Sequence, residues 1–351
     1  DNIANNHDYS LFDLNVKNYK PLNNFNWKIQ LRKEERLHQQ IAVVYDSIGF
    51  GKGDYRYDST FNTYIPDSNG DYIAYNIFSG NKIQNTSIIG GQSFSIRFSE
   101  IPLINNTIIR LNSKQDFQGK SPTINRVFYS KTNDQGIMRG NIFNRVEIYF
   151  KNKSDMLFWF EQRKELNGMD PRGNEQKLSN EIGSDITKII TENFLLCNKL
   201  DINKYFINSI VSNYRNRNWS GWWNDFQLQY RFGNYIDIDL GFLLGSDKGQ
   251  SQNNNFSGKA YGLKLLNKIL YKDTGRFQSE ISLVNVTKNN ENVYLPPESL
   301  NGYPSGMSFR SNWRMQYYPN KSISLIISIN TINDKRYNDF IAIQGEVRAH
   351  F

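Results

Sequence analysis

The chain has 351 residues, of which 38% are hydrophobic, and a formal net charge of +8. No run of about eighteen apolar residues occurs and the mean hydropathy is −0.64, so a helical membrane span is excluded. Lys and Arg are scattered without a long basic run, so the charge does not predict nucleic acid as a partner. The single cysteine, Cys197, excludes an intrachain disulfide and a cysteine-based zinc site.

Residues 1–120 predict a small β-rich region, because short β-like stretches are broken by Gly, Asp, Asn and Pro. Segments of this region are candidates to join the sheet that follows it. The head of the chain is polar and rich in Asn, so we expect that the chain starts after a processed leader or is the C-terminal piece of a longer protein.

The motif Gly-Asp-Tyr occurs at 53–55 and again at 70–72, which predicts two related turns. Near the second motif Asp67, Asn69 and Asp71 alternate as the first oxygen ligands of a calcium loop do. No glutamate follows at the twelfth position of such a loop. Turns held by Asp and Asn side chains are therefore the stronger prediction, and a calcium site is the weaker one.

Residues 121–351 show a two-residue period that predicts about eleven strands. These strands cover residues 141–150, 155–165, 185–198, 204–215, 223–232, 235–244, 258–271, 276–286, 307–317, 321–331 and 338–351. Residues 124–130, 92–99 and 107–112 are candidates for three more. In 321–331 the side chains of Ile323, Leu325, Ile327 and Ile329 share one face, and only Ile326 breaks the pattern.

The predicted connections alternate in length along this region. Those at 152–153, 200–203, 233–234, 272–275 and 319–320 are tight, and those at 167–175, 217–222, 245–257, 287–306 and 332–337 are longer. A bacterial outer-membrane barrel has short periplasmic turns and longer outside loops, whereas a soluble sandwich has no reason to keep this parity. The sequence therefore predicts an all-β fold, an antiparallel transmembrane β-barrel of about 12–14 strands at 121–351, in the bacterial outer membrane.

Charged residues of both signs fall on the polar face of these strands. The candidates for lining the lumen are Asp237, Asp239, Lys264, Lys268, Arg276, Glu280, Arg310, Arg314, Glu346 and Arg348. Two arrangements satisfy such charges: they line a narrow water-filled pore, or they pair across a small barrel and close it.

The last strand ends on an aromatic residue and carries apolar or small residues at alternate positions: Ile343, Gly345, Val347, Ala349 and Phe351. These residues are similar to the C-terminal signal by which the barrel-assembly machinery recognises its clients. Together with the segment Gly-Lys-Gly-Asp-Tyr and the segment Pro-Asp-x-Asn-Gly-Asp-Tyr, this end resembles the C-terminal part of very large, poorly characterised surface proteins of the Gram-negative outer membrane. The resemblance covers the chain from about Arg36 and implies lipid, the assembly machinery and upstream or other surface domains as partners.

Catalytic histidine pairs are not predicted. The chain has three histidines, His7, His38 and His350, and none lies near a predicted outer rim. We therefore expect no enzyme activity and no cofactor. Three hypotheses remain: a membrane anchor or assembly domain of a larger surface protein, a pore for small polar or charged solutes, and a soluble secreted protein that binds glycans.

Overall fold

The computed structural model describes residues 9–19, 23–60, 62–99, 106–119, 137–151, 154–170, 173–210, 215–251, 254–271, 274–290, 293, 295–320, 322–336 and 339–349. They form 17 strands in one sheet, together with a 3-10 turn, η3 (Ser299–Gly302). No helix in these ranges is long and apolar enough to cross a membrane.

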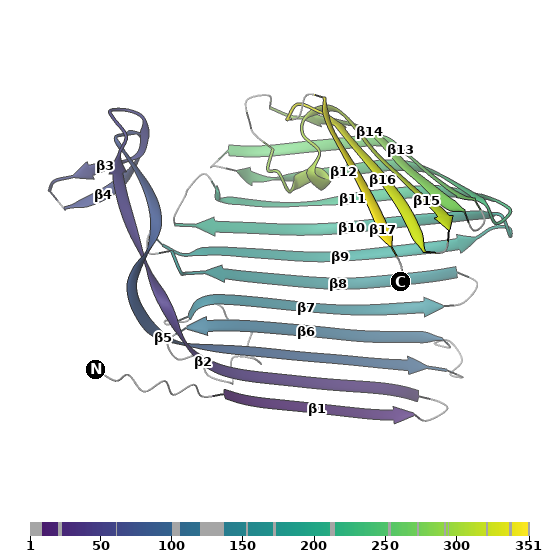
Figure 1. Ribbon diagram of the computed structural model, residues 1–351, viewed down its shortest axis with the longest axis horizontal. Coiled ribbons are helices and arrows are strands. Elements are labelled where there is room, and N and C mark those ends of the chain that lie inside the picture. Colours follow the sequence, from purple (N-terminus) through teal and green to yellow (C-terminus); the bar gives the residue numbers. More distant parts are fainter. Residues whose placement is uncertain are drawn as a thin grey trace.

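Most of the sheet is an antiparallel meander in which each strand pairs with the next (Figure 1). The strands are β1 (Tyr9–Tyr19), β2 (Asn23–Ser47), β3 (Gly53–Asp58), β4 (Thr63–Gly70), β5 (Tyr72–Phe98), β6 (Thr107–Gly119), β7 (Ile137–Lys151), β8 (Ser154–Asn167), β9 (Glu175–Ile189), β10 (Phe194–Ser209), β11 (Arg217–Phe232), β12 (Ile236–Ser251), β13 (Asn254–Tyr271), β14 (Gly275–Lys288), β15 (Gly306–Asn320), β16 (Ile323–Asn333) and β17 (Phe340–Ala349). The exception is the β3–β4 hairpin, because β2 pairs directly with β5.

The two ends of the sheet are β1 and β17. Within the described ranges β1 pairs only with β2, and β17 only with β16. Because neighbours alternate in direction, β1 and β17 run the same way. Figure 1 shows that the sheet curls strongly, with β14–β17 steeply inclined to β6–β9.

The all-β antiparallel prediction is confirmed. The sheet has 17 strands, more than the predicted number, because β1, β2, β3 and β4 also belong to it. Residues 92–99 and 107–112 lie in β5 and β6, whereas the candidate strand 124–130 lies outside the described residues. The boundary at 120 stays a prediction, although β6 and β7 pair across it.

The predicted turn at 200–203 is wrong. These residues lie inside β10, and the turn is at 190–193, where the Thr191 hydroxyl accepts a hydrogen bond from the Phe194 amide at 3.1 Å. Lys199 and Asp201 pair at 3.3 Å on one face of β10, while Ile202 is exposed on the other. The polar residues that suggested a turn therefore belong to the polar side of an alternating strand, and 217–222 likewise lies in β11.

The predicted long loop at 245–257 is also wrong, because β12 and β13 continue to Ser251 and from Asn254. Two glycines that suggested a loop lie beneath tryptophans. A Cβ on Gly245 would lie 2.5 Å from the Trp223 ring, and one on Gly249 would lie 2.5 Å from the Trp219 Cα. Glycine is needed there for close packing inside a hairpin.

The N-terminal half of β5 and the C-terminal half of β2 form a long ribbon that stands away from the sheet and carries the β3–β4 hairpin (Figure 1). The two Gly-Asp-Tyr motifs face each other there: Gly53 pairs with Gly70, and Tyr55 pairs with Tyr72. A Cβ on either glycine would lie within 2.3 Å of the opposite backbone. Only glycine allows this approach, which explains the repeated motif.

Candidate functional site

The two faces of the sheet differ in an unusual way. Large apolar side chains lie exposed along one face; Ile327 is 49% exposed and Ile343 is 72% exposed. The next residues along the strands face the opposite side and are small or polar, as Ser308 and Ser324 are, both 0% exposed. Ile326 is apolar but lies on the polar side, where it is buried. The sheet thus presents its apolar face outward, the reverse of a soluble sandwich.

We call the opposite side the inner face. The inner face includes residues directly across from one another in neighbouring strands, such as Gln227, Gly241, Lys264 and Ser282. The predicted apolar faces of β11, β12, β14, β15, β16 and β17 all point away from it.

Several predicted lumen residues form local pairs on the inner face. The Lys264 Nζ lies 3.0 Å from Glu280 Oε1 and 3.6 Å from Asp225 Oδ2, an acid that the prediction missed. The Arg276 Nε donates to Gln316 at 2.8 Å. The Arg310 guanidinium lies 3.8 Å from Asp334.

The other predicted lumen residues lie apart from these. Asp237 pairs with Arg231 at 3.9 Å, and Glu346 pairs with Arg348 at 2.6 Å. In the register, Lys268 is opposite Asp237 and Arg314 is opposite Gln278, whereas Asp239 has one buried carboxylate oxygen without a hydrogen-bond partner in the described chain. The structure therefore distributes the predicted set over β11–β17, and its role in lining a lumen stays a prediction.

The remaining candidate residues, those of the calcium site, the assembly signal and the histidines, either make local contacts or lie outside the described residues. Asp67 accepts from the Asn69 amide at 3.0 Å within β4, and Asp71, between β4 and β5, accepts from the Gly51 amide at 3.2 Å. Nearby on the ribbon, a hydrogen bond to Asp46 raises the pKa of the Tyr75 hydroxyl. Of the proposed assembly signal, Ile343, Gly345, Val347 and Ala349 lie in β17. Phe351, His7, His350 and the His38 side chain lie outside the described residues.

Residues 295–305 of the connection between β14 and β15 fold back onto the inner face, and together with Val293 we call them the inward loop. Its turn η3 contacts β11, β12 and β13. Leu300 of this loop is 1% exposed. The loop and the inner face share one hydrophobic cluster, made of Trp219, Trp223, Leu243, Phe256, Ala260, Val284, Val286, Val293, Leu295 and Leu300.

Polar contacts fix the inward loop at several points. The buried Asp247 carboxylate accepts a hydrogen bond from the Leu300 amide at 2.5 Å. Glu298 pairs with Arg217 at 2.5 Å, and the Gly302 carbonyl accepts from Arg310 at 2.7 Å. The Arg310 guanidinium also lies 3.9 Å from the centre of the Tyr303 ring. These contacts hold the loop against the wall of the sheet, because charge-assisted hydrogen bonds are the stronger kind.

The sequence predicted residues 287–306 as a long loop on the outer side of the membrane, and the contact of this loop with the inner face was not predicted. The signal was present, since Val293, Leu295, Leu300 and Tyr303 are apolar or aromatic residues inside a supposed solvent loop. Trp219 and Trp223 on the otherwise polar side of β11 form the matching surface. Apolar residues on both sides could have indicated the contact.

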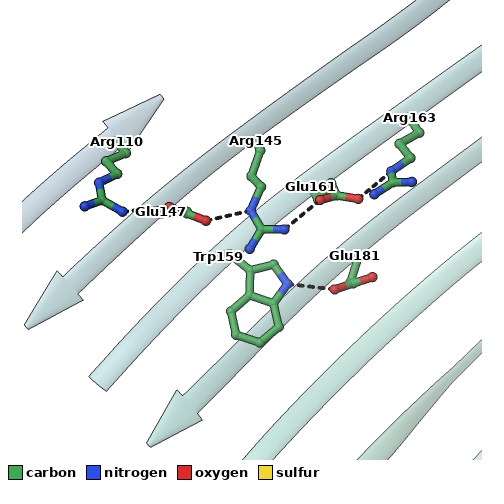
Figure 2. A network of polar contacts seen from close by, with 7 residues as sticks. All are labelled: Arg110, Arg145, Glu147, Trp159, Glu161, Arg163 and Glu181. Atoms are coloured by element: carbon green, nitrogen blue, oxygen red, sulfur yellow. Dashed lines mark hydrogen bonds and ion pairs between the residues drawn. The ribbon is translucent and has the colours of Figure 1, made fainter. Parts of the chain in front are cut away.

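The inner face of β6–β9 carries a polar network instead (Figure 2). The Arg145 guanidinium joins Glu147 at 2.8 Å and Glu161 at 2.9 Å, and Glu161 also pairs with Arg163 at 2.6 Å. At its ends Arg110 lies 3.9 Å from Glu147, and the Trp159 indole donates to Glu181 at 2.7 Å. None of these residues was among the candidates predicted from the sequence.

A cavity of about 670 Å³ lies beside this network, at the end of β6–β9 away from the tight turns. Charges of both signs line it, including Lys114, Arg139, Asp116 and Glu175. Two of its acids are engaged, since Glu175 pairs with Arg215 at 2.9 Å and Lys177 pairs with Glu165 at 3.6 Å. The inner face is thus filled by the inward loop at β11–β14 and hollow at β6–β9.

No family model and no curated protein matches the chain. Among solved structures, the ferric yersiniabactin uptake receptor FyuA from Yersinia pestis has 8% identity and a TM-score of 0.40, with 97% of this chain and 70% of that chain covered. The ferric-catecholate import receptor Fiu from K12 E. coli has 9% identity and a TM-score of 0.41 over 97% and 73%. The outer membrane channel DcaP of Acinetobacter baumannii has 8% identity and a TM-score of 0.37 over 91% and 97%. The chain is a distant structural match to these proteins, too distant to assign it a role.

Proposed function

We propose that the chain is a non-enzymatic β-barrel protein of a bacterial outer membrane. The observation that carries this proposal is the exposed apolar face, which continues over consecutive strands from β11 to β17. Each large apolar side chain that leaves water stabilises the protein by roughly 1.5–3 kcal/mol, so such a face favours lipid over solvent. The same face argues against the soluble glycan-binding hypothesis.

A barrel in lipid has no free sheet edge, because unpaired backbone groups in hydrocarbon are costly. We infer that the backbone groups at the edges of β1 and β17 are hydrogen-bonded in the membrane. The two edges pair either with each other or with a further strand. Since β1 and β17 run the same way, a direct contact between them would be a parallel pair, whereas single-chain bacterial barrels close with even numbers of antiparallel strands.

Inside this barrel we propose a water-filled path for small polar or charged solutes. The supporting observation is the hollow, charge-lined inner face at β6–β9, where a cavity of about 670 Å³ remains. The second candidate is a membrane anchor or assembly domain of a larger surface protein, which the inward loop supports because it fills the inner face at β11–β14. Lipid and the barrel-assembly machinery are partners in either case.

Fractionation of cells that produce the chain, followed by recordings in planar bilayers, tests these proposals. Recovery in the outer-membrane fraction with stable stepwise conductance is the expected result. Insertion without conductance would support the anchor and contradict the pore. Recovery in the soluble fraction without detergent would contradict both.

A further inference from the structure

A second cavity, of about 640 Å³, lies on the inner face where β1, β2, β5, β6 and β7 run side by side. The charged residues that line it are all cations: Lys28 and Arg32 from β2 and Lys114 from β6. Hydrogen-bonding groups and rings complete the lining, from Gln30, Ser93, Asn112, Tyr9 and Phe143. Pockets that combine apolar surface with a few placed polar groups are typical of small-molecule sites.

Arg32 is only partly satisfied by its neighbours. Its Nη2 lies 2.5 Å from Glu34, and its guanidinium lies 5.4 Å from the centre of the Tyr9 ring. Its Nε is buried and has no hydrogen-bond partner among the described residues. A guanidinium group has five donors, so a donor remains for an anionic oxygen.

The two lysines are available as well. Neither Lys28 nor Lys114 forms an ion pair with another residue that the structure describes. Three acids lie beside the cavity without lining it: Glu34 pairs with Arg32, Asp13 accepts from Gln30 at 2.9 Å, and Asp116 lines the neighbouring cavity. The cavity therefore holds positive charge that its own lining does not neutralise.

Gly91 leaves room on the floor of the cavity. It is opposite Gln30 on one side and Lys114 on the other. A Cβ built on it would meet nothing closer than the Ser113 carbonyl oxygen at 3.9 Å. A larger side chain at this position would therefore fill the cavity without a backbone clash.

We propose that this cavity binds a small organic anion, with carboxylate or phosphate oxygens held by Lys28, Lys114 and Arg32. The rings of Tyr9 and Phe143 contact the apolar part of the same molecule. The proposal rests on the proposed function, because it requires an inner face that solutes can reach. It adds the class of solute, since uncharged or cationic molecules would leave Lys28 and Lys114 without an opposite charge.

Calorimetric titration of the purified full chain in detergent micelles tests the site. The probes are phthalate, glucose 6-phosphate and uncharged glucose, which separate a carboxylate from a phosphate site. We expect at least one anion to bind and glucose not to bind. Lys28→Gln and Lys114→Gln should each weaken binding about tenfold, the effect of one charge-assisted hydrogen bond.

Two further variants complete the test. Gly91→Leu should abolish anion binding while the variant unfolds as the parent chain does. Lys82→Gln removes the same charge from an exposed position on the ribbon and should leave binding unchanged. Binding of neither anion, equal binding of glucose, or unchanged affinity in the Lys28, Lys114 and Gly91 variants would overturn the proposal.

Conductance in planar bilayers distinguishes failure of the anion site from failure of the proposed pore. A chain that conducts but binds neither anion contradicts the site and leaves the pore. A chain that binds an anion through Lys114 but does not conduct contradicts the pore and leaves the site.

Discussion

The inner face has two regions, which belong to the same antiparallel sheet but differ in what covers the strands on that side. At β11–β14, Trp219, Trp223 and Leu243 point inward and bury the inward loop in a hydrophobic cluster. At β6–β9 the inward residues are Arg145, Glu161 and their partners, beside an open cavity. An identical backbone pattern can therefore build a filled half or a hollow half, and the side chains on the inner face decide which.

Leu300→Asp should have the largest effect, because it places a carboxylate in the filled half. Leu300 is 1% exposed, and its Cδ1 lies 2.7 Å from where a Cβ on Gly258 would be. We expect a loss of about 3 kcal/mol or more in the free energy of unfolding, and release of the inward loop. Urea unfolding in lipid vesicles and limited proteolysis of the folded protein measure these two effects.

The neighbouring variant Asn301→Asp is the matched control. Asn301 is exposed and has a φ of 52°, a conformation that Asp tolerates better than most residues. Its inward loop should resist protease as the parent loop does. Equal cleavage of the two variants would contradict the idea that apolar burial holds the loop.

A double-mutant cycle tests the hollow half. The Arg145 Nη1 lies 2.9 Å from Glu161 Oε2, and the Glu161 side chain is 7% exposed. We expect Arg145→Gln and Glu161→Gln to show a coupling free energy of about 1–3 kcal/mol, because the pair is partly desolvated. Additive effects of the two substitutions would show that the Arg145–Glu161 pair contributes no coupling free energy.

The same cycle at the sheet edge should give the smallest effect. Glu346 and Arg348 pair at 2.6 Å on β17, where their side chains are 42% and 51% exposed. Solvent screens such a pair, so the coupling between Glu346→Gln and Arg348→Gln should be about 0–1 kcal/mol. A value as large as that of the Arg145–Glu161 pair would remove the distinction between interior and edge.

The class of fold could be predicted from the sequence because the alternation of apolar and polar side chains along a strand is visible residue by residue. The apolar faces of β15 and β16 are the ones that the period of Met307–Tyr317 and Ile323–Ile329 predicts. The prediction of turns failed where polar residues and glycines occur because of contacts with neighbouring strands. Lys199 and Asp201 pair on the inner face, and Gly245 makes room for Trp223.

The candidate sites depended on contacts that a linear pattern does not contain. Lys264 and Glu280 were both named from their faces, and the register brings them together. Strand faces and register do not contain the contact of the inward loop, because Leu300 meets Asp247 across 53 residues of chain, and only the apolar residues of both segments pointed to it. The cavity at Lys28 and Lys114 likewise needs β2, β5 and β6 side by side.

The central claim is that the exposed apolar face contacts lipid, and a pair of arginine substitutions in the middle of β16 tests it most directly. Ile327 is 49% exposed on the apolar face, and Ser328 lies next to it on the inner face. The free energy of unfolding in lipid vesicles should fall by about 2–4 kcal/mol for Ile327→Arg and by less, about 0.2–1 kcal/mol, for Ser328→Arg, whose new charge lies opposite Arg314. An Ile327→Arg protein as stable as the parent chain, and recovered without detergent, would contradict the claim.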